Sequence, residues 1–229
     1  MIYLKRHRFL YIEVPKAGST SLSHFFINNA CNDDDVYSGD WSSGADQTCH
    51  NIEPIHCKVG HKDLNYIIDH NILTEQEVRA SRVVGIIREP LERLLSCFFA
   101  KIKQRELRVL PTKEEFKRNL IEGDGRIIAR REWLRKQQTD FMQINGENIG
   151  EWILFERLDN FIKDVIIDYD IKVTNPFEHR NKGLSVDYRK LIDTWYDNEL
   201  LDLVHKNNQD DFEIYERTKN EYRETRLES

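Results

Sequence analysis

Hydrophobic residues form two kinds of pattern along the chain. Short apolar runs occur at residues 9–14, 82–87 and 152–155, and runs of this length are typical of buried strands. Residues 55–61 are a further strand candidate. Elsewhere apolar residues recur three and four positions apart, as on one face of a helix. The clearest helical face follows a proline and consists of Leu91, Leu94, Leu95, Phe98 and Ile102. Alternation of these two patterns predicts an α/β fold.

The order of the elements predicts three layers, in which helices flank a mainly parallel central sheet. Thr74 and Glu77 have the spacing of a capping box at a helix start. The polar residues 28–53 predict a long irregular loop, and the charged tail from Glu216 is expected to fray. Chain length favours a single domain over residues 1–229. Further helices are predicted at 22–30, 74–80, 158–167, 188–196 and 200–204.

Charge and composition narrow the possible partners. The formal net charge is −6, which argues against a nucleic-acid binder, whose affinity rests on a cationic surface. No apolar stretch approaches the roughly 20 residues of a membrane span, and no signal-peptide core follows the start, so we expect a cytoplasmic protein without a membrane span. The cysteines form no CxxC pair, which favours reduced thiols.

Residues 14–21 join a predicted strand to a predicted helix and read Val-Pro-Lys-Ala-Gly-Ser-Thr-Ser. Free N–H groups and the helix dipole favour an anion at such a place. Gly18 permits close approach of the backbone, and Lys16 supplies a positive charge. The lysine precedes the glycine, so this segment is no Walker A loop. The alternative is an ordinary strand-to-helix turn with a Ser/Thr cap.

A second candidate anion site follows the predicted strand at 82–87 and reads Arg-Glu-Pro-Leu-Glu-Arg-Leu-Leu-Ser. Arg88 lies at the carboxyl end of that strand, where ligands of open α/β sheets bind. An arginine fork and the hydroxyl of Ser96 can hold a phosphate group. The alternative is that Arg88 pairs with Glu89 or Glu92 as a surface bridge.

Together the two segments resemble the donor-binding motifs of sulfotransferases that use 3′-phosphoadenosine-5′-phosphosulfate (PAPS). Residues 15–21 resemble the 5′-phosphosulfate loop and residues 88–96 the 3′-phosphate motif, in matching order. The sequence of residues 87–96 is most similar to the corresponding motif of the carbohydrate branch, which includes the Golgi glycosaminoglycan enzymes. Further resemblance runs through residues 153–158 and 196–215.

This resemblance implies a P-loop-like fold and sulfuryl transfer from PAPS, with 3′-phosphoadenosine 5′-phosphate (PAP) as product and no metal. It places Arg88 and Ser96 on the 3′-phosphate, with Arg93 a weaker candidate. Lys182, within Asn-Lys-Gly, falls where such enzymes close a late segment over the cofactor. The residues implied at the 5′-phosphosulfate are Lys16, Ala17, Gly18, Ser19, Thr20 and Ser21.

In-line transfer needs a base for the acceptor proton and a cation for the leaving phosphate oxygen. Lys16 suits the second task. His61 follows a glycine, a context in which related enzymes often place their base, although His24, His50 and His56 compete. A zinc site is the alternative use of the residues Cys49, His50, His56, Cys57 and His61. Strand geometry at 55–61 would point His56 and Cys57 to opposite sides, which argues against such a site.

Two rival functions remain open. A P-loop-type kinase or nucleotidase would use the same strand-loop-helix cradle, but the chain lacks its motif and a clear aspartate-ended strand for magnesium. The second rival function is that of a non-catalytic nucleotide-binding protein, because a fold alone never proves turnover. The acceptor is expected to be a hydroxyl or an amine, with a glycan favoured by analogy alone.

Overall fold

The computed structural model describes residues 1–39, 48–53, 61–103, 111–129, 131–179 and 186–227. The chain forms two compact units. The first comprises Met1–Ile87 and Gln138–Asn181, and the second comprises Arg88–Gln137 and Lys182–Ser229. The single domain expected from chain length stays a prediction.

The first unit is built on a mixed sheet. Its strand order is β4-β3-β1-β2-β5-β8, with β2–β5 and β5–β8 parallel and the other described pairs antiparallel. The prediction of a mainly parallel sheet is therefore wrong. A short turn of 3-10 helix joins β1 to β2, and so short a connection permits only an antiparallel return. The strands are β1 (Ile2–Leu4), β2 (Phe9–Ile12), β3 (Val36–Gly39), β4 (Thr48–His50), β5 (Arg82–Ile87) and β8 (Glu151–Leu154).

Strand β5 has the bounds that its apolar run predicts. It lies inside the sheet between β2 and β8, with Tyr11 opposite Val84 and Val84 opposite Glu151. From Val83 onward every residue of the strand is buried. A strand covered on both faces needs apolar side chains in both directions, which explains why its sequence signal was continuous.

The polar segment 28–53 departs from its prediction. It contributes β3 and β4 to the edge of the sheet, where we expected an irregular loop. Polar residues are tolerated in these strands because an edge strand need not be apolar on both faces. The predicted strand at 55–61 lies outside the described residues, apart from His61, which is in neither a helix nor a strand.

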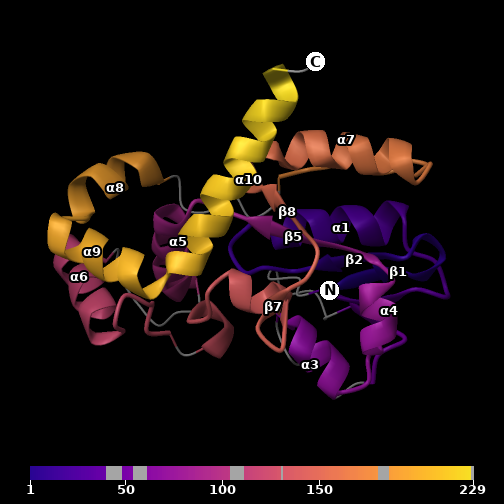
Figure 1. The fold of residues 1–229 in the computed structure, drawn as a ribbon, viewed down its shortest axis with the longest axis horizontal. Coiled ribbons are helices and arrows are strands. Elements are labelled where there is room, and N and C mark those ends of the chain that lie inside the picture. Colours follow the sequence, from indigo (N-terminus) through magenta and orange to yellow (C-terminus); the bar gives the residue numbers. More distant parts are fainter. Residues whose placement is uncertain (40–47, 54–60, 104–110, 130, 180–185, 228–229) are drawn as a thin grey trace. The chain divides into compact units, whose positions relative to one another are not determined.

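Helices lie on both sides of the sheet in the first unit. Figure 1 shows α1 (Ser19–Asn29) and α7 (Leu158–Asp168) on one side, and α3 (Leu64–Asp69) and α4 (Glu75–Arg79) on the other. The predicted helices at 22–30, 74–80 and 158–167 are confirmed, and the capping box of Thr74 and Glu77 is present at the start of α4. A small hairpin of β6 (Gln143–Ile144) and β7 (Glu147–Asn148) completes the unit.

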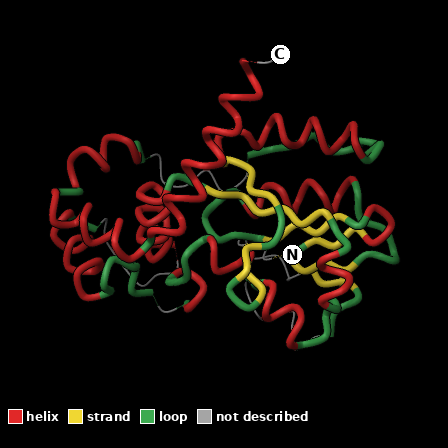
Figure 2. Tube along the Cα trace, in the orientation of Figure 1, coloured by secondary structure: helices red, strands yellow, loops and turns green. Residues whose placement is uncertain are grey.

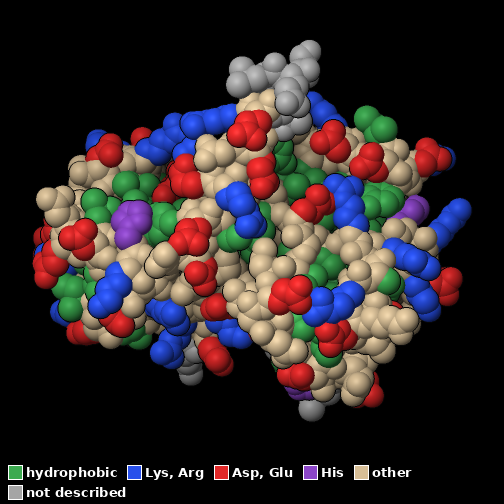
Figure 3. Space-filling view, viewed as in Figure 1, with side chains coloured by type: hydrophobic (Ala, Val, Ile, Leu, Met, Phe, Trp, Pro, Cys, Tyr) green, Lys and Arg blue, Asp and Glu red, His purple; other side chains and the backbone are tan. Residues whose placement is uncertain are grey.

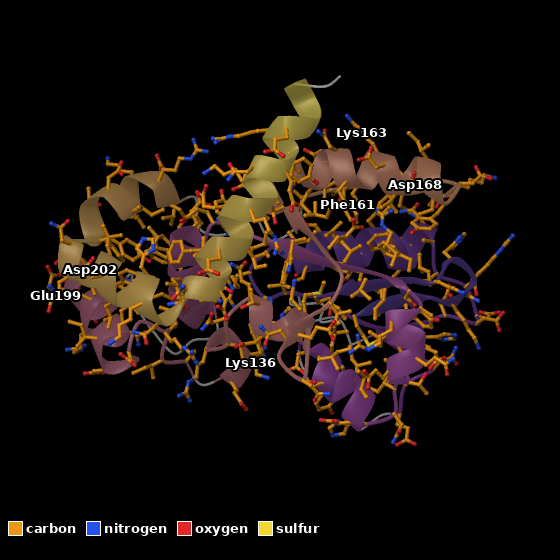
Figure 4. All side chains as sticks on the ribbon, viewed as in Figure 1. Lys136, Phe161, Lys163, Asp168, Glu199 and Asp202 are labelled. Carbon is orange, nitrogen blue, oxygen red and sulfur yellow. The ribbon has the colours of Figure 1, made fainter. Side chains whose placement is uncertain are left out.

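Helix α7 shows how the amphipathic spacing places side chains. Phe161 is buried and Lys163 is exposed, and Figure 4 shows them on opposite sides of the helix, with Phe161 toward the sheet. At the end of α7 the Asp168 carboxylate pairs with Arg82 Nη1 at 3.1 Å. This ion pair ties the end of α7 to the start of β5.

The described part of the second unit consists of helices joined by loops and contains no strand, as Figure 2 shows with helices in red and loops in green. Its core is an apolar cluster that includes Phe98, Phe116 and Leu200. The tail expected to fray from Glu216 is instead part of a helix that ends at Leu227. Buried Ile214, Tyr215 and Thr218 line one side of that helix. The helices are α5 (Pro90–Lys103), α6 (Lys113–Glu122), α8 (Tyr188–Trp195), α9 (Asn198–Asn207) and α10 (Gln209–Leu227).

Charged side chains of both signs are interspersed over the face shown in Figure 3. This mixture agrees with the small net charge. No helix among the described residues is both long enough and apolar enough to cross a membrane.

Candidate functional site

The turn between β2 and α1 has a specialised backbone. Lys16 and Gly18 both have positive φ, at 66° and 82°. A Cβ on Gly18 would lie 2.7 Å from Leu158 Cδ1 and 3.2 Å from Phe155 Cε2. Glycine is therefore needed here twice, for its left-handed conformation and for its close packing against the start of α7.

The N-terminus of α1 has the features of an anion site. Its N-cap is Gly18, no side chain caps it, and its first turn contains no acidic residue. The Gly18 carbonyl accepts from the N–H groups of Ser21 and Leu22 at 3.1 and 3.3 Å. The two earlier N–H groups of the helix, those of Ser19 and Thr20, have no acceptor within the helix. These donors, with the helix dipole, favour a negatively charged ligand. A Ser/Thr-capped turn, the alternative from the sequence, is not what the structure has.

The side chains that follow line the same turn. Ser19 and Ser21 are buried, and Lys16 and Thr20 are half-buried. Ala17 is fully buried, and its N–H donates to the Val14 carbonyl at 3.4 Å. The predicted 5′-phosphosulfate residues thus occupy one continuous strand-to-helix turn of the first unit.

A buried acid that the sequence analysis missed precedes this turn. Glu13 is 5% exposed, and its carboxylate accepts hydrogen bonds from the Met1 ammonium, at 2.8 Å, and from the Ser23 hydroxyl. Burial by itself would raise the pKa of Glu13. The Met1 ammonium, the nearby His61 and the two hydrogen bonds outweigh burial and lower the pKa below its ordinary value. Glu13 is therefore ionised at neutral pH.

The structure places His61 beside this acid. His61 Nδ1 lies 2.8 Å from the backbone carbonyl oxygen of Glu13, and the ring is half-buried. The predicted base and the predicted phosphate loop are therefore brought together in the first unit, because only Val14 and Pro15 separate Glu13 from Lys16.

The competing histidines have other surroundings. Both ring nitrogens of His24 lie within 3.0 Å of the Asn28 side chain on the exposed side of α1. His50 Nε2 contacts the Asp33 carbonyl at 3.0 Å, and its ring stacks on Tyr37. His56 lies outside the described residues. Among the residues that are described, no group of three or more His, Cys, Asp or Glu side chains could hold a metal ion.

In the second unit Arg88 is held between two partners. It is 8% exposed, and its Nη2 lies 3.0 Å from Glu92 Oε2. Its guanidinium carbon lies 4.9 Å from the ring centroid of Tyr188, at the start of α8. The alternative pairing of Arg88 with Glu92 is thus present, but the pair is largely buried and is no surface bridge. The sequence places Tyr188 only within the predicted helix at 188–196 and gives it no role in the site.

Helix α5 holds the other predicted residues of this segment. Glu89 accepts from the Glu92 N–H at 2.6 Å, and the Glu89 carbonyl accepts from the Arg93 N–H at 2.9 Å. Ser96 and Arg93 are 5% and 2% exposed. Like Arg88, both side chains are buried, so burial does not separate Arg93 from the other two residues. Lys182 lies outside the described residues.

A family model identifies the chain. The model of the sulfotransferase family matches residues 1–168, which is well over half of the sequence. The chain belongs to the sulfotransferase family. The match spans the turn at residues 14–21 and the Arg88–Ser96 segment, whereas α8, α9 and α10 lie beyond it.

Family membership makes the protein a transferase and implies a P-loop-like arrangement of its mixed sheet and flanking helices. Members of this family generally use PAPS as donor. No curated protein and no solved structure matches the chain. The signal that would have revealed Glu13 was already in the sequence, since an acid that interrupts an apolar run needs a buried partner.

Proposed function

We propose that this sulfotransferase moves a sulfuryl group from PAPS onto a hydroxyl or amine acceptor and releases PAP. The observation that carries the proposal is the turn before α1, where an uncapped helix start follows Lys16 and contains the buried residues Ser19 and Ser21. Such a turn within a matched sulfotransferase sequence is best explained as the binding site of the 5′-phosphosulfate.

Both donor motifs follow strands that end at the same edge of the sheet. Strands β2 and β5 are parallel, with Ile12 opposite Gly85, so their carboxyl ends share an edge. The chain leaves β5 at Ile87 and continues directly into Arg88. This order supports binding of the 5′-phosphosulfate by residues 16–21 and of the 3′-phosphate by Arg88 and Ser96. Lys182 is proposed as a further donor contact on the resemblance alone.

The transfer is an in-line displacement at sulfur. The acceptor oxygen or nitrogen forms a bond to sulfur while the bond from sulfur to the phosphate oxygen breaks. His61 removes the acceptor proton, and Lys16 stabilises the charge that develops on the departing phosphate oxygen. No step requires a metal ion.

A carbohydrate hydroxyl is the first acceptor class to test, because residues 87–96 resemble the carbohydrate branch. The test incubates the protein with ³⁵S-labelled PAPS, without magnesium, and with separate panels of glycans, phenols and amines. We expect label to move to at least one acceptor class, and the Lys16→Ala variant to transfer much less.

Two results would contradict the proposal. Magnesium-dependent transfer of the ATP γ-phosphate would indicate a kinase or nucleotidase. Binding of PAPS without transfer to any acceptor would indicate a non-catalytic nucleotide-binding protein.

A further inference from the structure

Glu13 is a buried charge that the proposed mechanism does not yet use. It stands between the last residue of β2 and the phosphate turn, and its side chain is fixed by the Met1 ammonium and the Ser23 hydroxyl. Placing a carboxylate in a protein interior costs free energy unless it is paired and hydrogen-bonded. Because Glu13 lies next to His61, it can act on the proposed catalytic base.

The contact with the backbone of Glu13 determines which nitrogen of His61 carries a proton. A carbonyl oxygen only accepts hydrogen bonds, so His61 Nδ1, 2.8 Å from the Glu13 oxygen, must be the donor. In the neutral ring the other nitrogen, Nε2, then holds the lone pair. Nε2 is therefore the atom that can take a proton from an acceptor.

The carboxylate of Glu13 acts on the same ring through its charge. The backbone carbonyl of the same residue contacts this ring at 2.8 Å, so the charge is carried by a residue that adjoins His61. When Nε2 takes a proton the ring becomes a cation, and a fixed negative charge nearby stabilises that cation. Ser23 and Met1 limit the movement of the carboxylate, so its position does not depend on the acceptor.

We propose that Glu13 is the positioning residue for the base: its carbonyl holds His61 with Nε2 basic, and its carboxylate stabilises the imidazolium formed during transfer. This inference rests on the proposed function, in which His61 is the base. The carbonyl and the carboxylate do separate tasks, so each can be tested separately.

The tautomer is measured without any catalytic assay. Long-range ¹H–¹⁵N correlation spectra of the ¹⁵N-labelled protein distinguish Nδ1–H from Nε2–H histidines, and a His61→Gln variant assigns the signal. We expect His61 to be neutral with its proton on Nδ1 at the upper end of its titration. A proton on Nε2 would overturn the proposal even if the protein transfers sulfate.

The carboxylate is tested with Glu13→Gln, which removes the charge and leaves the carbonyl in place. Partners that orient metal-bound histidines typically contribute about 10–100-fold to metal affinity or activity, and we take the same scale for a partner of His61. We therefore expect kcat to fall by roughly tenfold or more, while the Kd for PAP stays within about twofold, since the acid does not touch the donor. Glu13→Asp retains the charge and should recover most of kcat.

Equal losses of kcat in Glu13→Gln and Glu13→Asp, or no loss in a folded Glu13→Gln protein, would overturn this part of the inference. Ser23→Ala is the matched control, because it removes one hydrogen bond to the carboxylate and keeps the charge. Its loss of kcat should be smaller than that of Glu13→Gln. If Glu13→Gln fails to fold, the tautomer measurement on the unmodified chain still decides the role of the carbonyl. The carboxylate is then tested with Ser23→Ala, where an unchanged kcat would overturn its role. A wild-type protein that transfers to no acceptor contradicts the proposed function, whereas the tautomer tests Glu13 independently.

Discussion

The two candidate anion sites are built in different ways. In the first unit the turn before α1 is formed mainly by backbone, with Gly18 in a left-handed conformation packed against Leu158 and the first turn of the helix uncapped. In the second unit the candidate site is a side chain, Arg88, whose guanidinium already contacts Glu92 and Tyr188.

This difference has a physical consequence for ligand binding. A backbone turn is ordered by the fold itself, so an anion that binds there meets donors that need little reorganisation. Arg88 instead has a carboxylate partner at 3.0 Å. A phosphate that binds Arg88 must share the guanidinium with Glu92. The Tyr188 ring holds the guanidinium in position while both anions contact it. The first site should therefore depend on backbone conformation, and the second on the side chains around one cation.

The largest expected effect separates catalysis from donor binding. His61→Ala should lower turnover by roughly 10²–10⁴, as is typical when a general base is removed, and should leave PAP affinity nearly intact. Lys16→Ala should reduce both transfer and donor affinity, because its charge acts on the donor itself. Single-turnover transfer and calorimetry on both variants measure these changes. Wild-type transfer by folded His61→Ala protein would place the base elsewhere.

The backbone character of the first site is tested with Gly18→Ala. The added Cβ meets Leu158 at 2.7 Å at a positive φ, so strain and crowding together should destabilise the protein by about 2–4 kcal/mol and abolish measurable PAP binding. Gly146→Ala is the matched control, since Gly146 also has positive φ but no atom within 4 Å of the added Cβ. It should cost only about 1–2 kcal/mol and keep PAP affinity. Equal effects of the two variants in denaturant titrations and calorimetry would show that packing against α7 is unimportant.

The side-chain character of the second site is tested with Arg88→Ala. Charge-assisted hydrogen bonds contribute about 1.5–3 kcal/mol, so PAP affinity should fall roughly tenfold or more, while AMP affinity should hardly change. Lys117→Ala removes a cation that pairs with Asp197 and Glu199 in the same unit, and it should alter neither affinity. A parallel loss of PAP and AMP affinity in Arg88→Ala would assign the arginine to some other role.

The smallest effect is expected at Tyr188. A cation–π contact contributes about 0.5–2 kcal/mol depending on its exposure, so Tyr188→Ala should weaken PAP binding a few-fold by loosening Arg88. Tyr188→Phe keeps the ring and should bind PAP as the wild type does. Calorimetry on this pair of variants isolates the ring, and a loss in Tyr188→Phe as large as in Tyr188→Ala would point to the hydroxyl instead.

Local signals in the sequence predicted the elements that carry the site. The bounds of β5, the start of α5 after Glu89 and the capping box of α4 were all predictable, because each depends on residues within one or two turns of one another. The edge strands β3 and β4 were missed because polar edge strands lack a continuous apolar run. The antiparallel return of β1 depends on pairing, which periodicity does not encode.

In the site, too, features set by neighbouring residues were predictable, and features set by distant residues were not. Lys16 and Gly18 were predictable because their order along one turn is characteristic of an anion-binding loop. Tyr188 lies 100 positions after Arg88, and His61 lies 48 positions after Glu13. Contacts over such separations are set by the tertiary fold, so one sequence does not reveal them.

The most direct test of the account is calorimetry on the wild-type protein with PAP and with AMP, two nucleotides that differ only in the 3′-phosphate. We expect PAP to bind at least about tenfold more tightly, because Arg88 and Ser96 are proposed to contact that phosphate with charge-assisted hydrogen bonds. Equal affinity for the two nucleotides would contradict the assignment of these residues to the donor.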